Sequence, residues 1–166
     1  AARRAFEEDL ATLGDILLER YRSRASDRGR DGDYNRLGIM AAQLGRYAEA
    51  ERAFNDAVRV NADYTAARIN LGSMYFLLEE YERALGVFEE ALQRIRSQPR
   101  ARAEEELKVL LNLSKTSYEL REYEAAGEYY EMASLINPEA VAEYTNLAAT
   151  AGDSEAGRAA ESEEWR

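Results

Sequence analysis

The sequence YNRLG at residues 34–38 is followed 34 positions later by RINLG at residues 68–72. The agreement continues downstream, because YAEA at residues 47–50 aligns with YERA at residues 81–84. A step of 42 residues brings NLS at 112–114 and YEAA at 123–126 into the same register, and a further step of 34 brings in YTNLA at 144–148. The chain therefore contains three full copies and the front half of a fourth, and a repeat of this length is typical of a solenoid.

Each copy is predicted to be a pair of antiparallel helices. In the first copy, Asp33 is expected to cap a helix that runs to about Leu44, and Gly45-Arg46 forms the turn. A second helix is predicted from Tyr47 to about Val60. Small residues recur where two helices must approach closely, and aromatic residues recur where they fill the remaining space. The small residues are Gly38, Gly72, Ser114, Ala148, Ala50, Ala84 and Ala126, and the aromatic residues are Phe54, Phe88 and Tyr130.

These positions resemble the tetratricopeptide repeat family over roughly residues 31–151. The resemblance implies an all-α, right-handed solenoid of antiparallel helix pairs, with repeats at 31–64, 65–106 and 107–140 and a partial copy at 141–151. The second copy has Arg68 where an aromatic residue is usual, and the third has Ser114 in place of glycine. Eight extra residues precede the third copy around residues 97–100, and we expect one added turn on each flanking helix. Asn137-Pro138 predicts an N-cap followed by proline at the first helical position.

The two ends, residues 1–30 and 152–166, do not follow the repeat. Residues 2 to about 24 predict a helix that caps the N-terminal end of the solenoid, because solenoid ends need polar caps. Residues 23–32, rich in Arg, Asp, Gly and Ser, are predicted to form a mobile loop, and residues 152–166 a polar cap or tail. The apolar face expected on the N-terminal helix consists of Phe6, Leu10, Leu13, Leu17 and Tyr21.

The composition excludes several classes of site. The 166 residues include 32 acidic and 22 basic residues, a net charge of −10, and neither cysteine nor histidine. A zinc finger, a disulfide framework, a Ser-His-Asp triad and a cysteine nucleophile are therefore excluded. The acidity argues against nucleic-acid binding, and no apolar run suits membrane insertion. We expect a soluble protein without enzymatic activity, metal or cofactor, either cytoplasmic or periplasmic or exported after loss of a signal segment.

The first helix of each pair is expected to face the concave side of the solenoid. One inward position there repeats as Arg36, Asn70, Asn112 and Asn146. Because asparagine provides both a donor and an acceptor, a row of asparagines can hold an extended peptide backbone at intervals. The resemblance implies the same role, since peptide-binding tetratricopeptide proteins often use asparagine at this place. The alternative is that these asparagines turn or cap the local backbone.

Neighbouring inward positions complete the predicted groove. They combine apolar side chains with two lysines, which predicts a protein or peptide partner with acidic side chains; ordinary solvated lysines are the alternative. Of the carboxylate clamp found in chaperone-binding members of the family, only Asn70 and Lys108 fit, so a dedicated binder of C-terminal chaperone tails is not expected. The inward positions are Asn35, Ile39, Ser73, Phe76, Lys108, Lys115 and Tyr118.

Two further patterns have simpler explanations than function. The sequence DGDYN at residues 31–35 resembles the start of a calcium loop, but glycine would then be needed at Arg36 and glutamate at Ala42. Capping by Asp31 or Asp33 explains these residues better. Most of the eleven tyrosines are predicted to be core residues on repeat positions, namely Tyr34, Tyr47, Tyr81, Tyr123, Tyr130 and Tyr144.

The sequence thus predicts a protein-interaction scaffold that binds an extended peptide or a partner helix in its concave groove. The alternative is a self-assembly module, in which the repeats or the N-terminal helix mediate homo-oligomerisation.

Overall fold

The computed structural model of the chain describes residues 2–99 and 102–143, with side chains from residue 12 onward. The named elements in these residues are all helices, and the chain is helical again over residues 138–143. In chain order the helices are α1 (Ala2–Arg28), α2 (Asp31–Gln43), α3 (Tyr47–Val60), α4 (Thr65–Leu77), α5 (Tyr81–Arg96), α6 (Ala103–Glu119) and α7 (Tyr123–Ile136).

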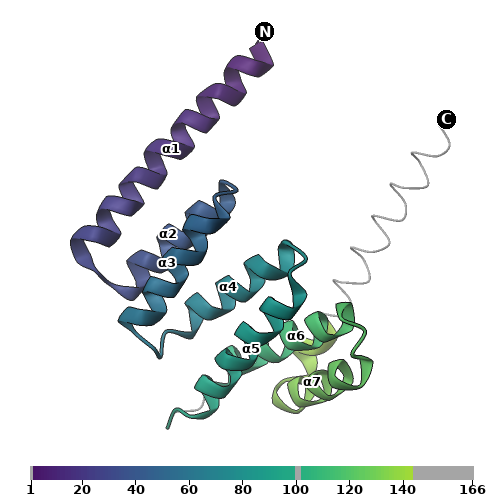
Figure 1. Cartoon of the computed structure of the whole chain (residues 1–166). Coiled ribbons are helices and arrows are strands. Elements are labelled where there is room, and N and C mark those ends of the chain that lie inside the picture. The colour runs from purple at the N-terminus through teal and green to yellow at the C-terminus, as the bar shows by residue number, and fades with distance from the viewer. Residues whose placement is uncertain (1, 100–101, 144–166) are drawn as a thin grey trace, which may run out of the picture.

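The helices pair and stack in one direction, with α1 at one end and α7 at the other (Figure 1). The closest pairings are α2 with α3, α4 with α5 and α6 with α7, and each pair packs on the next through α3 on α4 and α5 on α6. Helix α1 packs on α2 in the same manner, so it occupies the place of a second helix in front of the first pair. The predicted all-α solenoid of antiparallel helix pairs is confirmed.

Within each of the first two pairs, an aromatic ring lies against a residue that lacks a side chain. A Cβ added to Gly38 would lie 2.5 Å from Phe54 Cε1, and one added to Gly72 would lie 2.6 Å from Phe88 Cε1. Both rings are fully buried. In the third pair, the Ser114 hydroxyl donates a hydrogen bond to the carbonyl oxygen of Ala126, 2.8 Å away. The expected close approach at the small repeat positions is therefore present in all three pairs.

The predicted bounds of the second helix, from Tyr47 to Val60, are confirmed by α3. The turn before it contains Gly45 in the left-handed region, at φ +70°, where glycine is favoured. The predicted cap at Asn137 is also present, because its side-chain oxygen accepts the N–H of Ala140 at 3.0 Å, just after Pro138. Gly45 and Asn137 each act on backbone groups only a few residues away, so the sequence nearby is enough to predict them.

The prediction that Asp33 caps the first repeat helix is wrong. Helix α2 already begins at Asp31, and its N-cap residue Arg30 makes no side-chain capping bond. Asp33 lies inside the first turn with its side chain only 4% exposed, and the Arg24 guanidinium pairs with it at 2.8 Å. Asp31 accepts two hydrogen bonds, one from the backbone N–H of Gly32 at 2.7 Å and one from the side-chain amide of Asn61 at 2.6 Å. Both carboxylates therefore bind neighbouring elements.

The prediction of a mobile loop at residues 23–32 is also wrong. Helix α1 continues to Arg28, and only Gly29 and Arg30 separate it from α2. Ala25 is fully buried, so tertiary packing extends the helix by about one turn beyond its predicted end near residue 24. Gly29, at φ +58°, ends the helix, and its N–H donates to the carbonyl oxygen of Ala25.

The packed face of α1 is rotated from the predicted one. Leu18 and Ala25 are buried and Tyr21 is half-buried, whereas Leu13 is exposed and Leu17 is half-buried. The side chains of Phe6 and Leu10 lie outside the described residues. Gly14 lies on the packed face, because a Cβ there would lie 2.7 Å from Leu44 Cδ2. The contact face of α1 thus contains a glycine, which a search for regularly spaced apolar residues does not detect.

The extra residues before the third copy are divided unequally between the flanking helices. Helix α6 has 17 residues against 13 in α4, so it gains the expected turn. Helix α5 has 16 residues against 14 in α3, which is only half of the expected turn.

The prediction that the repeat tyrosines are core is wrong for three of them. Tyr47, Tyr123 and Tyr130 are exposed, whereas Tyr34 and Tyr81 are half-buried. Tyr144 lies outside the described residues. Tyr47 and Tyr123 begin second helices, and at that point the ring lies at the edge of the helix pair rather than between its helices.

Candidate functional site

The inner surface of the solenoid is formed by α2, α4 and α6. Among the described helices, α2 contacts α4 and α4 contacts α6 more closely than α3 contacts α5 or α5 contacts α7. The helices of the closer layer therefore lie on the inside of the curve. The described candidate residues come from these helices: Asn35, Arg36 and Ile39 from α2, Ser73, Phe76 and Asn70 from α4, and Lys108, Asn112, Lys115 and Tyr118 from α6. Asn146 lies outside the described residues.

A chain of hydrogen bonds orients the Asn70 side chain. Its Nδ2 donates to Asn35 Oδ1 at 2.9 Å, and Asn35 Nδ2 donates to the Tyr64 hydroxyl at 3.4 Å. Asn35 is only 7% exposed, so it acts as part of the wall behind Asn70. The Asn70 side chain forms no further hydrogen bond among the described residues, and its carbonyl oxygen and second N–H are left for another partner.

The other polar candidates have simpler surroundings. Asn112 is half-buried, and its side chain makes no hydrogen bond within the described part of the chain; only its backbone carbonyl does, accepting the Thr116 hydroxyl at 2.7 Å. Arg36 is exposed and lies 3.6 Å from the Asp33 carboxylate, which also pairs with Arg24. Its positive charge is therefore partly compensated.

Aromatic residues repeat along the inner edge. The rings of Phe76 and Tyr81 meet edge to face with centroids 5.2 Å apart, and Tyr118 and Tyr123 do the same at 5.4 Å. Lys115 Nζ lies 4.4 Å above the centre of the Phe76 ring, which gives a cation–π contact between α6 and α4. Lys108 is exposed on the same helix as Lys115.

Negative charge also lies near this edge. Burial raises the pKa of the Tyr81 hydroxyl, and the carboxylates of Glu119 and Glu79 raise it further. Glu119, four residues after Lys115 on α6, thus places a carboxylate beside a lysine at this edge.

A hollow of about 240 Å³ opens between α2 and α4. Sequence reasoning assigned only three of its lining residues to the groove, namely Ile39, Asn70 and Ser73, and it missed the hollow itself. The signal that reveals it is Ala42, which lies 34 residues before Phe76 and therefore replaces an aromatic residue in the first copy. The hollow is lined by Ile39, Ala42, Gln43, Tyr47, Phe54, Asn70, Ser73, Met74 and Leu77.

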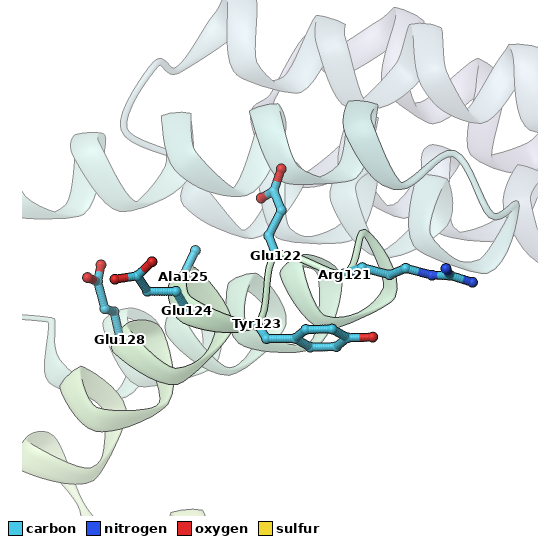
Figure 2. Close-up of a pocket in the computed structure, with 6 residues that line it drawn as sticks. All are labelled: Arg121, Glu122, Tyr123, Glu124, Ala125 and Glu128. Carbon is cyan, nitrogen blue, oxygen red and sulfur yellow. The ribbon is translucent and has the colours of Figure 1, made fainter.

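A larger depression of about 600 Å³ lies where α7 begins. Figure 2 shows the Glu124 and Glu128 carboxylates close together on the left, Glu122 pointing upward, and Tyr123 and Arg121 pointing to the right. Nearly all of its lining residues are exposed, so it is a shallow surface feature. Among the side chains of residues 12–99 and 102–143, no group of three or more acidic residues is arranged to hold a metal ion. No helix in residues 2–99 and 102–143 is both long enough and apolar enough to cross a membrane.

Comparisons with known proteins agree with this architecture. Two family models, both described as tetratricopeptide repeat, match residues 35–99 and 107–139. None of the curated proteins compared with the chain matches its sequence.

Solved structures show the same fold at low sequence identity. The N-terminal domain of stress-induced protein-1 (STI-1) from C. elegans is 16% identical, with a TM-score of 0.62 over 70% of this chain and 93% of that one. A MamA protein is 16% identical, with a TM-score of 0.63 over 76% of this chain and 66% of that one. YrrB, described as a TPR protein with an unusual peptide-binding site, is 16% identical, with a TM-score of 0.57 over 71% of this chain and 57% of that one.

Proposed function

Since the chain belongs to the tetratricopeptide repeat family, whose solenoids are protein-interaction scaffolds, we propose that its inner face binds an extended peptide. Asn70 and Asn112 hydrogen-bond to the peptide backbone, and Ile39, Phe76 and Tyr118 contact its apolar side chains. Lys108 and Lys115 attract its acidic side chains.

The observation that carries the proposal is the orientation of Asn70. Its bond to the buried Asn35 holds the side chain in one position while leaving a donor and an acceptor unused. Side chains that are held in place before binding lose less conformational entropy when a ligand arrives. Asn112 occupies the equivalent position one copy later. Two asparagines at regular intervals suit an extended peptide, whose backbone N–H and carbonyl groups also recur at regular intervals.

Substitution of the two asparagines tests the proposal. Peptides are first selected on the native protein from a random display library, and their affinities are then measured by fluorescence anisotropy. We expect Asn70→Ala combined with Asn112→Ala to weaken binding by about tenfold or more, because each hydrogen bond contributes about 1 kcal/mol. Asn55→Ala, an exposed asparagine on the outer helix α3, is the matched control and leaves the affinity unchanged.

Stability is measured beside affinity, because Asn70→Ala also removes a partner from the buried Asn35. That loss costs about 1 kcal/mol of folding free energy, whereas Asn112→Ala leaves the stability unchanged. Binding is therefore compared at a temperature at which every variant is folded. Equal affinity in the native protein and the double variant would contradict the assigned groove.

Self-association is the alternative, and exposed apolar residues on α1 favour it. Leu13 and Ile16 are both exposed on α1, away from its packed face. Sedimentation velocity over a range of concentrations separates the two functions. A monomer at every concentration counts against self-association, and a dimer that is lost on deletion of residues 1–24 supports it.

A further inference from the structure

We propose that the hollow between α2 and α4 is a pocket for one aromatic side chain of an acidic peptide. The proposal rests on the function proposed above for the inner face and names the residue types that the groove selects. The occupant is inferred from the way in which the other repeats fill the equivalent space.

The second and third copies contain an aromatic ring where the first has none. Phe76 packs edge to face on Tyr81 at an interplanar angle of 61°, and Tyr118 packs on Tyr123 at 66°. Thirty-four residues before Phe76 and Tyr81, the first copy has Ala42 and Tyr47. The Ala42 side chain ends at Cβ, so Tyr47 lacks the ring that its counterparts contact and is 43% exposed. An aromatic side chain from a ligand restores the missing pair.

The size and walls of the hollow suit such a ring. A cavity of about 150 Å³ holds a benzene molecule, and this hollow measures about 240 Å³. Phe54 and Met74, both buried, are part of its wall, and methionine sulfur makes favourable contacts with aromatic rings. Leu77 is 81% exposed although it lines the hollow, so a ligand that covers it removes apolar surface from water.

Polar groups place the ligand backbone beside the pocket. Asn70 lines the hollow, and it is the asparagine whose amide is held by Asn35. A residue whose side chain enters the pocket therefore has its own backbone N–H and carbonyl within reach of Asn70. The pocket and the backbone contact thus select the same ligand residue.

Charge on the neighbouring helix indicates acidic residues next to the aromatic one. Lys108 and Lys115 are exposed on α6, and Lys115 is held over the Phe76 ring at 4.4 Å. The protein as a whole has a net charge of −10, so an acidic peptide is repelled elsewhere and is attracted where these lysines lie. Glu119, four residues after Lys115 on α6, ends the positive region at that end of the helix.

The test uses labelled synthetic peptide libraries that differ at one position. Short peptides of randomised Asp, Glu, Ser and Gly carry a single Phe, a single Leu or a single Ala, and a further Phe library has Asn and Gln in place of the acids. We expect the acidic Phe library to bind the native protein about tenfold or more tightly than the Ala library, as burial of a phenyl ring predicts. The uncharged Phe library binds more weakly than the acidic one.

The decisive variant is Ala42→Phe, which gives the first copy the ring that the second copy already has. It is expected to abolish the preference for Phe over Ala without lowering the melting temperature. Ala48→Phe, an exposed alanine on α3 outside the hollow, is the matched control and keeps the preference.

A direct measurement on the native protein covers the case in which Ala42→Phe fails to fold. Titration with p-cresol is expected to shift the methyl NMR signals of Ile39, Met74 and Leu77. The absence of such shifts would overturn the pocket.

The results of these experiments distinguish a failure of the proposed aromatic pocket from a failure of the proposed peptide-binding groove. Equal binding of the Phe and Ala libraries, with both weakened by Asn112→Ala, overturns the pocket and leaves the proposed function standing. No binding by any library overturns both. Dimerisation that Ala42→Phe abolishes identifies a second copy of the chain as the occupant and overturns the peptide assignment.

Discussion

At the scale of single residues, each of the first two helix pairs is held together by a contact between an aromatic ring and a glycine. Phe54 lies on Gly38 and Phe88 lies on Gly72, and both rings are fully buried. Protein cores are packed densely enough that even one added methyl group is resisted at such a contact. These glycines therefore serve close packing, and their backbone angles play no special part.

We expect Gly72→Ala to lower the free energy of unfolding by about 1–3 kcal/mol, because overpacking forces a buried ring to move. The new Cβ would lie 2.6 Å from Phe88 Cε1. Gly86→Ala, in α5 with nothing within 4 Å of its added Cβ, is the control. There alanine should stabilise the helix by about 0.5–1 kcal/mol. Urea denaturation measures both, and equal effects would contradict the packing argument.

A second residue-scale prediction concerns Tyr75, whose ring is buried. The Arg83 guanidinium donates a hydrogen bond to its hydroxyl at 2.6 Å and lies 3.9 Å from the centre of its ring. Burial, with a contribution from Glu51, raises the pKa of Tyr75 from 10.0 to about 12. Between these two values the unfolded chain has released a proton that the folded protein retains, so the free energy of unfolding falls as the pH rises.

Tyr75→Phe should remove this contribution. We expect the stability of the variant, measured by urea denaturation across that pH range, to fall less steeply than that of the native protein. Tyr118→Phe, which removes a hydroxyl from an exposed ring, should decline as the native protein does. Identical slopes for Tyr75→Phe and the native protein would show that Tyr75 does not contribute.

At the scale of elements, α1 completes the stack by covering α2. It contacts α2 as α3 contacts α4, and ion pairs secure it on one side, with Arg22 bound to Glu49 and Arg24 bound to Asp33. The helix has one face buried against the solenoid and another exposed. Which apolar residues contribute to stability therefore depends on the rotation of the helix about its axis.

Two alanine substitutions on α1 report that rotation. We expect Leu18→Ala, at a side chain 1% exposed, to cost about 2–5 kcal/mol of folding free energy through the cavity it leaves. Ile16→Ala, at a side chain 61% exposed, should change it by less than about 0.5 kcal/mol. Thermal melts in matched buffer compare them, and a reversed order would mean that α1 packs on its other face.

At the scale of the whole molecule, the chain is a linear stack in which each helix contacts its neighbours along the row. Helix α4 contacts α2, α3, α5 and α6, whereas α1 has α2 as its main contact. Stability in such a stack is the sum of the repeats and their interfaces, so the ends open more easily than the middle.

Native-state hydrogen exchange should follow this order. We expect the amides of α4 and α5 to exchange most slowly and those of the N-terminal part of α1 to exchange first, because local opening breaks fewer interfaces there. Mass spectrometry of pulse-labelled peptides resolves the helices. Equal protection of α1 and α4 would indicate a single cooperative unit.

The sequence by itself determined the repeat, the helix pairs and the ring-on-glycine contacts. The bounds of α3 and the cap at Asn137 also follow from residues close to the backbone groups concerned. The repeat makes these features easier to recognise, because the same residue types recur at equivalent positions in successive copies. The inner positions proposed for Asn70, Asn112 and the two lysines rest on the same spacing, since residues three and four apart share a helix face.

Only the tertiary structure decided which side chains meet between helices. In the tertiary structure, Asp33 pairs with Arg24, and α1 packs with Gly14 in its contact face. Asn35 holds the Asn70 side chain, and a hollow lies between Ala42 and Tyr47. Each of these contacts joins residues on different helices. Their meeting depends on how far each helix is rotated and how closely it approaches its neighbour, and residue spacing along one helix contains neither quantity.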